Sequence, residues 1–278
     1  MSIWMAVFLG LVQGIAEFLP ISSSGHLAIL QNLFHVNQNQ SAGSLLLFDV
    51  LLHTGTLVAV IFAFRKDIAN ILRGLFLSSR EARGSEAQLK GSSARKLFWM
   101  LVLATVPLVI AIPFQSRVDA LMGSTVFVGA MLILTGALLF VSDRFTRGRK
   151  TEREMRVSDA VAVGICQAIA IVPGLSRSGT TISAGMASGL DREFAVKFSF
   201  LLSIPAVLGA TVVSLLGALK DGVQLNFSYL VGAMVAAVVG YFAIRFVRGL
   251  AKRGKFGRFA YYCWAVGALA IVLSFVLG

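Results

Sequence analysis

Six long runs of apolar residues dominate the pattern along the chain. A helix needs roughly 20 apolar residues to cross the hydrocarbon core of a bilayer, and each run is close to that length. The pattern therefore predicts an all-α polytopic membrane protein. The predicted spans are 45–64, 97–114, 126–141, 194–216, 229–246 and 259–277.

Composition supports this fold class. The 278 residues are 57% hydrophobic and only 14% charged, whereas soluble domains carry about 25% charged residues. The net charge of +12 raises nucleic acid as a partner, but no basic patch with interleaved aromatic residues accompanies it. We therefore expect membrane lipid, and no nucleic acid, around this chain.

The basic residues gather in short segments between the apolar runs. Of the 25 Lys and Arg residues, 8 lie in 65–96, 6 in 144–156 and 6 in 245–258. Short basic loops stay on the cytoplasmic side of a membrane, so these three segments are expected inside and both chain termini outside. The outward-facing loops would then be those near Asn37, Arg117 and Lys220.

Two further segments are expected to form helical hairpins that dip into the membrane and return. Residues 158–189 start and end on the cytoplasmic side in this topology, so they cannot cross an odd number of times. Residues 1–31 are expected to form the matching hairpin from the outer side, because the sequence repeats itself there. Shifted by 154 residues, 10–25 aligns with 164–179 without a gap, and seven of the 16 pairs are identical.

The repeat predicts two halves of opposite orientation within one membrane domain. Residues 1–148 would hold one re-entrant hairpin and three transmembrane helices, and residues 149–278 would hold the same set. Three crossings are an odd number, so the second half is inverted relative to the first. Inverted-topology repeats with broken helices place their site near the bilayer midplane, where the halves meet.

The hairpins carry polar residues that are costly inside a membrane. The first reads QGIAEFLPISSSGH and ends at His26, and the second contains PGLSRSGTT. Serine-rich turns often serve only helix packing, and a lone histidine is usually structural. An ionised residue at mid-membrane costs about 2.5–3.5 kcal/mol on insertion scales. Glu17 in the first hairpin and Arg177 in the second therefore favour a functional site over packing.

The Ser-Ser-Ser-Gly and Ser-Arg-Ser-Gly turns are suited to an anion. Hydroxyls and consecutive backbone N–H groups beside a helix N-terminus favour phosphate, and Arg177 can bind two phosphate oxygens at once. Glu17 would repel phosphate, so it is expected to bind a divalent metal, to orient His26 or to act as a base. Mg²⁺ commonly uses one or two carboxylates plus substrate phosphate oxygens. The candidate phosphate-binding residues are Ser22, Ser24, Gly25, Ser176, Ser178 and Gly179.

These motifs resemble those of the undecaprenyl-diphosphatase family, also called bacitracin-resistance proteins. The resemblance covers the whole chain, and its most specific segments are 13–26, 173–181 and FSFLLSIP at 198–205. It implies hydrolysis of undecaprenyl diphosphate to the monophosphate at the outer face of a bacterial inner (plasma) membrane, with the help of a divalent metal, Mg²⁺ or Ca²⁺. Such an enzyme recycles the lipid carrier of cell-wall synthesis and confers bacitracin resistance.

The resemblance also implies roles for particular residues. His26 would act as general acid/base, and Ser23 would be the nucleophile or a substrate ligand, with His26 and water as the other candidate nucleophiles. Gln13 stands where some members carry Glu, which puts a metal role for that position in doubt. The family's functional positions map onto Glu17, Ser22, Ser23, His26, Arg177 and Thr181, and Thr181 is expected among the diphosphate-binding residues.

Several alternatives stay open at this point. Asp49 and His53, four residues apart, belong either to helix packing or to the rim of the site. The Ser24–His26 triplet is also found in lipid phosphatases of the phosphatidic-acid-phosphatase type, but Ser183 stands where their motif needs a histidine. A transporter or lipid flippase would use the same inverted-repeat site, and a non-catalytic scaffold would leave Glu17 and Arg177 unexplained. The oligomeric state, a homodimer included, is undetermined.

Overall fold

The computed structural model describes residues 1–34, 42–76, 85–114, 118, 120–145, 148–220, 226–254 and 256–277. Within these ranges the chain is helical, and its β-type pairing is a single isolated bridge between Lys150 and Leu190. The elements are α1 (Ile3–Ala16), α2 (Ser23–Leu33), α3 (Ala42–Ala63), α4 (Arg65–Phe76), α5 (Ser85–Ala111), η2 (Ile112–Phe114), η3 (Ala120–Gly123), α7 (Thr125–Phe145), α8 (Val157–Ile169), α9 (Arg177–Ala187), α10 (Arg192–Lys220), α11 (Phe227–Arg253) and α12 (Arg258–Leu277).

Six of the described helices are long and apolar enough to cross a membrane, namely α3, α5, α7, α10, α11 and α12. Each corresponds to one of the spans predicted from the apolar runs. The four helices α1, α2, α8 and α9 are shorter, and they form the two segments in which the sequence places hairpins. The prediction of an all-helical, multi-pass membrane protein is therefore confirmed.

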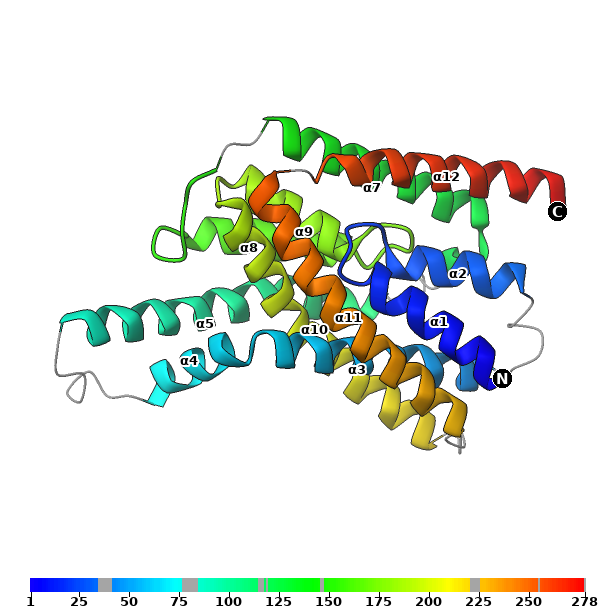
Figure 1. The fold of residues 1–278 in the computed structure, drawn as a ribbon, viewed down its shortest axis with the longest axis horizontal. Coiled ribbons are helices and arrows are strands. Elements are labelled where there is room, and N and C mark those ends of the chain that lie inside the picture. Colours follow the sequence, from blue (N-terminus) through cyan, green and yellow to red (C-terminus); the bar gives the residue numbers. More distant parts are fainter. Residues whose placement is uncertain are drawn as a thin grey trace.

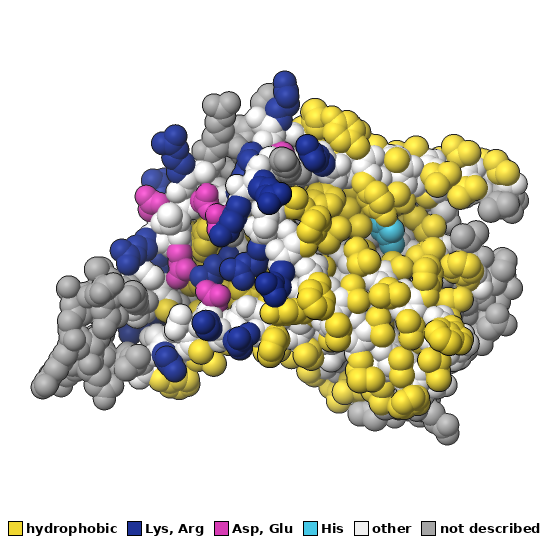
Figure 2. Space-filling model, viewed as in Figure 1, with side chains coloured by type: hydrophobic (Ala, Val, Ile, Leu, Met, Phe, Trp, Pro, Cys, Tyr) yellow, Lys and Arg dark blue, Asp and Glu magenta, His cyan; other side chains and the backbone are white. Residues whose placement is uncertain are grey.

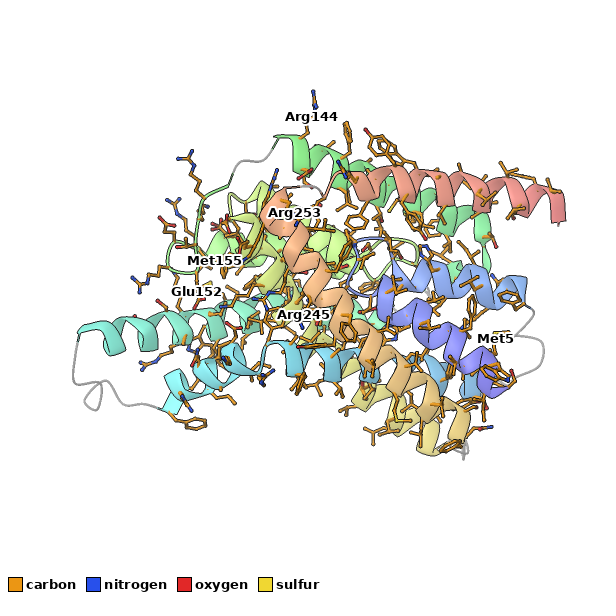
Figure 3. All side chains as sticks on the ribbon, viewed as in Figure 1. Met5, Arg144, Glu152, Met155, Arg245 and Arg253 are labelled. Atoms are coloured by element: carbon orange, nitrogen blue, oxygen red, sulfur yellow. The ribbon has the colours of Figure 1, made fainter. Side chains whose placement is uncertain are left out.

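Charged side chains gather at one end of the molecule. Figure 2 shows Lys, Arg, Asp and Glu at this end and apolar side chains over most of the remaining face. Ion pairs join different elements there, including Lys197 with Asp67 at 2.7 Å and with Glu152 at 3.2 Å. Arg144, Glu152 and Arg253 lie towards this end in Figure 3. A charged end of this kind suits water beyond the bilayer.

The start of α1 and the end of α12 lie at the opposite end of the molecule (Figure 1). Both termini thus lie at the end away from the basic segments, as the charge distribution predicts. Which end faces the cytoplasm stays a prediction. The loops at Asn37 and Arg117 and the last residue, Gly278, lie outside the described residues, and Lys220 ends α10.

One sequence interpretation is wrong. The basic stretch 65–96 reads as a loop, but it contains α4 and the first part of α5. Apolar residues recur through α4 at helical spacing, from Ile68 through Ile71 to Leu75, and the charged residues lie between them. Such a pattern forms an amphipathic helix, which packs on α5.

Matching helices of the two predicted halves make matching contacts. α1 packs along α11, and α8 packs along α5. The closest approaches occur at Gly10, against the Gly232 carbonyl, and at Gly164, against the Ala104 carbonyl. A Cβ at either glycine would fall well inside van der Waals contact with that backbone oxygen. Gly10 and Gly164 are aligned in the internal repeat, so one sequence feature has the same packing role twice.

We expect Gly10→Ala to destabilise the protein by about 1–3 kcal/mol, because the added methyl overpacks a backbone contact. Gly209→Ala is the matched control, since a Cβ there meets nothing within 4 Å and alanine is the better helix former. Thermal unfolding in detergent would compare the two variants. Equal midpoints for both would show that the α1–α11 contact is not tight.

Candidate active site

The first short helix pair is joined by a strained turn. α1 ends at Ala16, and α2 begins at Ser23 after the turn that contains Pro20. Ser22 caps α2, with its Oγ accepting a hydrogen bond from the Gly25 N–H at 3.2 Å. Its φ of +68° is the one positive φ at a non-glycine residue among those described. Such a conformation costs roughly 1–3 kcal/mol and is typical of functional sites.

The second turn repeats the cap without the strain. Ser176 caps α9, and its Oγ accepts a hydrogen bond from the Gly179 N–H at 3.0 Å. Its φ is −72°, and the positive φ in this turn, +91°, falls on Gly174. In both turns the capping serine also contacts the serine two residues later, at 3.3 Å, as Ser22 with Ser24 and Ser176 with Ser178.

The two turns contact each other reciprocally. A Cβ built on Gly25 would lie 3.3 Å from Cα of Gly174, and one built on Gly179 would lie 3.3 Å from Cβ of Pro20. Ser178 Oγ also donates to the Leu19 carbonyl at 3.3 Å. The N-termini of α2 and α9 are thereby brought together, although their sequence motifs are about 150 residues apart.

Glu17 and Arg177 join the two turns with an ion pair. The guanidinium of Arg177 donates to Oε1 of Glu17, whose side chain is only 5% exposed. The other carboxylate oxygen accepts from Gln13 Nε2 at 3.0 Å and from Ser23 Oγ at 2.6 Å. Burial of either charge alone would cost several kcal/mol, and pairing offsets that cost. The two charged residues that the sequence singles out are therefore direct partners.

His26 does not join this cluster directly. Its Nδ1 lies 2.8 Å from the Ser22 carbonyl oxygen, and its Nε2 lies 2.8 Å from the hydroxyl of Tyr262 on α12. The structure places His26 at the start of α2, within the same turn as Ser23, but directs its ring towards α12 rather than towards Arg177. Direct contact therefore joins Glu17 with Arg177, whereas the ring of His26 is bonded to the Ser22 carbonyl and to Tyr262.

Thr181 faces the neighbouring helix. Its Oγ1 lies 2.8 Å from the Arg177 carbonyl, to which it donates, and 2.6 Å from Ser199 Oγ on α10. These bonds fix the first turn of α9 against α10. Thr181 therefore holds in place the helix that carries Arg177, while its own hydroxyl is engaged within the protein.

His53 on α3 lies close to the buried carboxylate. Its Nε2 lies 3.7 Å from Glu17 Oε2, and its Nδ1 lies 2.8 Å from the Asp49 carbonyl oxygen. The Asp49 carboxylate accepts from Gln31 Nε2 at 2.9 Å, which ties α3 to α2. The sequence left these two positions open between packing and site rim. The geometry places His53 at the rim and Asp49 in the packing of α2 on α3.

The residues around Glu17 fit a hard divalent cation. Gln13 is fully buried, and its Oε1 has no hydrogen-bond partner. Because Gln13 Nε2 points at Glu17, a flip of this amide would bring Oε1 beside the Glu17 carboxylate and the Ser23 hydroxyl. These three groups would then offer the oxygen ligands that Mg²⁺ and Ca²⁺ prefer. No group of three or more His, Cys, Asp or Glu side chains able to hold a metal occurs among the described residues, so substrate oxygens would have to complete the coordination.

The fold and the site together define a class of protein. It is a polytopic membrane protein in which two serine-capped helix N-termini and a buried Glu–Arg pair form one polar site, a setting that favours a phosphate-bearing ligand. The family model described as bacitracin resistance protein BacA matches residues 6–269. The chain therefore belongs to the BacA family.

Curated relatives match along the full length of the chain. The protein of Methanosphaera stadtmanae named undecaprenyl-diphosphatase is 38% identical over 285 residues, which cover 100% of both chains. The protein of that name from Methanobrevibacter smithii is 40% identical, over 99% of this chain and 98% of its own. The one from Halothermothrix orenii is 39% identical, over 99% of each.

We expect Arg177→Gln to lower the free energy of unfolding by about 3 kcal/mol, because it leaves the Glu17 carboxylate buried and unpaired. The double variant Glu17→Gln/Arg177→Gln should recover most of that loss, since neither charge is then buried. The free energies of unfolding of the wild type, the two single variants and the double variant, measured in mixed micelles, form a double-mutant cycle. Additive losses would contradict a direct ion pair.

Proposed function

We propose that this protein hydrolyses undecaprenyl diphosphate to undecaprenyl phosphate and inorganic phosphate. The observation that carries the proposal is the contact between Glu17 and Arg177, because it unites two serine-capped helix N-termini in one polar site within an apolar domain. The name undecaprenyl-diphosphatase, shared by full-length relatives at 38–40% identity, supports this substrate. The family description further supports a role in bacitracin resistance, through recycling of the lipid carrier of cell-wall synthesis.

The proposed architecture is a pair of inverted repeats, 1–148 and 149–278, each with a re-entrant hairpin and three spans. The equivalent approaches of Gly10 to α11 and of Gly164 to α5 support it, as do the reciprocal contacts between the turns. The α1–α2 hairpin would enter from the outer side and the α8–α9 hairpin from the cytoplasm. The mouth of the site and both termini would face the outer side of the plasma membrane.

In the proposed complex the diphosphate lies between the two turns. The N-termini of α2 and α9 offer backbone N–H groups and a positive dipole end, and Arg177 provides a planar fork for two phosphate oxygens. In this proposal Arg177 turns from Glu17 to the phosphate, so substrate binding exchanges one anionic partner for another. The polyprenyl tail would lie along the apolar surface that faces lipid.

The contact between Ser23 and Glu17 supports a nucleophilic mechanism. A nucleophile within hydrogen-bond reach of a base is the usual arrangement for covalent catalysis, and Ser23 Oγ is 2.6 Å from Glu17 Oε2. Ser23 Oγ would attack the terminal phosphorus and pass its proton to Glu17, while the bond to the bridging oxygen breaks and undecaprenyl phosphate leaves. Water would then hydrolyse the phosphoserine, with His26 as general acid/base.

A transporter or lipid flippase is the alternative that the inverted-repeat architecture favours. Release of inorganic phosphate from undecaprenyl diphosphate by purified protein in detergent separates the two functions, because a transporter needs no hydrolysis. We expect one inorganic phosphate to be released for each undecaprenyl diphosphate consumed. Protein that binds the lipid without releasing phosphate would make the transporter the better proposal.

Arg177→Lys should lower phosphate release by about a hundredfold while the protein still folds. Lysine keeps the charge that pairs with Glu17, but it lacks the bidentate fork, and loss of one such electrostatic contact costs about that much. Arg192→Lys is the matched control, since Arg192 pairs with Asp143 at 3.0 Å at the charged end. Near-normal turnover of Arg177→Lys would remove Arg177 from the site.

A bound Mg²⁺ or Ca²⁺ would neutralise charge on the phosphate oxygens, and Glu17 and Gln13 are the residues proposed to hold it. A chelator should then abolish phosphate release, and added divalent ion should restore it. Gln13→Leu should raise the ion concentration needed for half-maximal rate, because it removes the unpartnered amide oxygen. Unchanged phosphate release in the presence of chelator would rule out the metal role of Glu17 and leave its role as a base.

A further inference from the structure

The last helix of the chain supplies a partner for His26 that no motif indicates. The hydroxyl of Tyr262 lies 2.8 Å from His26 Nε2. The two rings are also stacked, with centroids 5.7 Å apart and planes inclined by 7°. The residues are 236 positions apart in the sequence. This contact therefore links the end of the chain to the turn that carries Ser23.

The direction of each hydrogen bond follows from the chemistry of its partner. The Ser22 carbonyl can only accept, so His26 Nδ1 carries a hydrogen. Neutral imidazole then has its lone pair on Nε2, and the Tyr262 hydroxyl donates to it. After a second proton reaches the ring, Nε2–H can donate to the oxygen of the same hydroxyl. One tyrosine thus serves both protonation states of the histidine.

Neighbouring residues hold this part of α12 in place. Cys263 is fully buried, and its Sγ lies 3.7 Å from the Pro20 carbonyl of the first turn. The next residue, Trp264, donates from Nε1 to the Ile133 carbonyl of α7 at 3.1 Å. α12 is thereby fixed both to the turn and to α7, which sets the position of the Tyr262 ring relative to His26.

The adjacent tyrosine provides a comparison, because it makes different contacts. Tyr261 is 61% exposed, and its ring contacts are with Phe140 and Trp264. Tyr262 is 44% exposed and points about 100° away around the helix, towards His26. A tyrosine that served only as an anchor at the membrane surface would not need this stacked and hydrogen-bonded geometry.

We propose that Tyr262 is a positioning residue for His26. Its hydroxyl is hydrogen-bonded to Nε2, the ring nitrogen that gains and loses the proton, and its ring fixes the plane of the imidazole. The reactive nitrogen is therefore oriented before substrate arrives, which lowers the barrier of the chemical step rather than strengthening substrate binding. This inference rests on the proposed function, in which His26 is the general acid/base.

The test compares Tyr262→Phe with Tyr261→Phe, each of which removes one hydroxyl and keeps the ring. We expect Tyr262→Phe to lower kcat about tenfold, the effect of one hydrogen bond, and to leave KM for undecaprenyl diphosphate unchanged. Tyr261→Phe should match the wild type in both parameters. Unchanged kcat in Tyr262→Phe, or a raised KM with normal kcat, would overturn the proposal.

A spectroscopic arm tests the contact without any turnover. In protein labelled with ¹⁵N-histidine, with the His26 signals assigned by their loss in His26→Ala, Tyr262→Phe should move the Nε2 resonance towards that of a free imidazole nitrogen. Tyr261→Phe should not move it. An unmoved resonance overturns the proposal even if activity falls. If the wild type releases no phosphate, the proposed function fails. The Nε2 resonance of His26 still tests, in that case, whether Tyr262 holds the imidazole.

Discussion

A carboxylate and a guanidinium inside an apolar membrane domain must find partners of opposite charge, and here Glu17 and Arg177 find each other. Neither could be buried alone without a cost of several kcal/mol. Because the two residues lie in different turns, their pairing requires the turns to meet. The irregular backbone of both turns is thereby surrounded by protein, as the proposed re-entrant hairpins would require of non-helical backbone within a membrane.

The meeting of the turns also gives the site its electrostatic character. Ser22 and Ser176 each satisfy one N–H group at a helix N-terminus, and the dipole ends of α2 and α9 add to the charge of Arg177. Glu17 balances this positive potential in the absence of an anionic ligand. In the proposed mechanism a diphosphate would replace Glu17 as the partner of Arg177, and the carboxylate released in this way is already within hydrogen-bond reach of Ser23. Ligand binding and activation of the nucleophile would then be one event.

Much of this arrangement could be predicted from the sequence, because the repeat places similar residues at similar points of two short helix pairs. Gly10 and Gly164 align in sequence, and both make close backbone contacts. Glu17 and Arg177 stood out because charge is costly in a membrane. Contacts that depend on packing between distant helices carried no such signal. His53 reaches Glu17 from α3, and Tyr262 reaches His26 from α12; both distances depend on how whole helices pack. The amphipathic period of α4 is difficult to recognise in the sequence because it lies within a run of basic residues.

The most direct test is a structure with a non-hydrolysable polyprenyl diphosphonate bound. The account predicts that both phosphonate groups lie between the turn at Ser22–His26 and the turn at Ser176–Gly179. It also predicts that the Arg177 guanidinium has moved from Glu17 to the phosphonate oxygens. A head group bound elsewhere, with the Glu17–Arg177 pair intact, would contradict it.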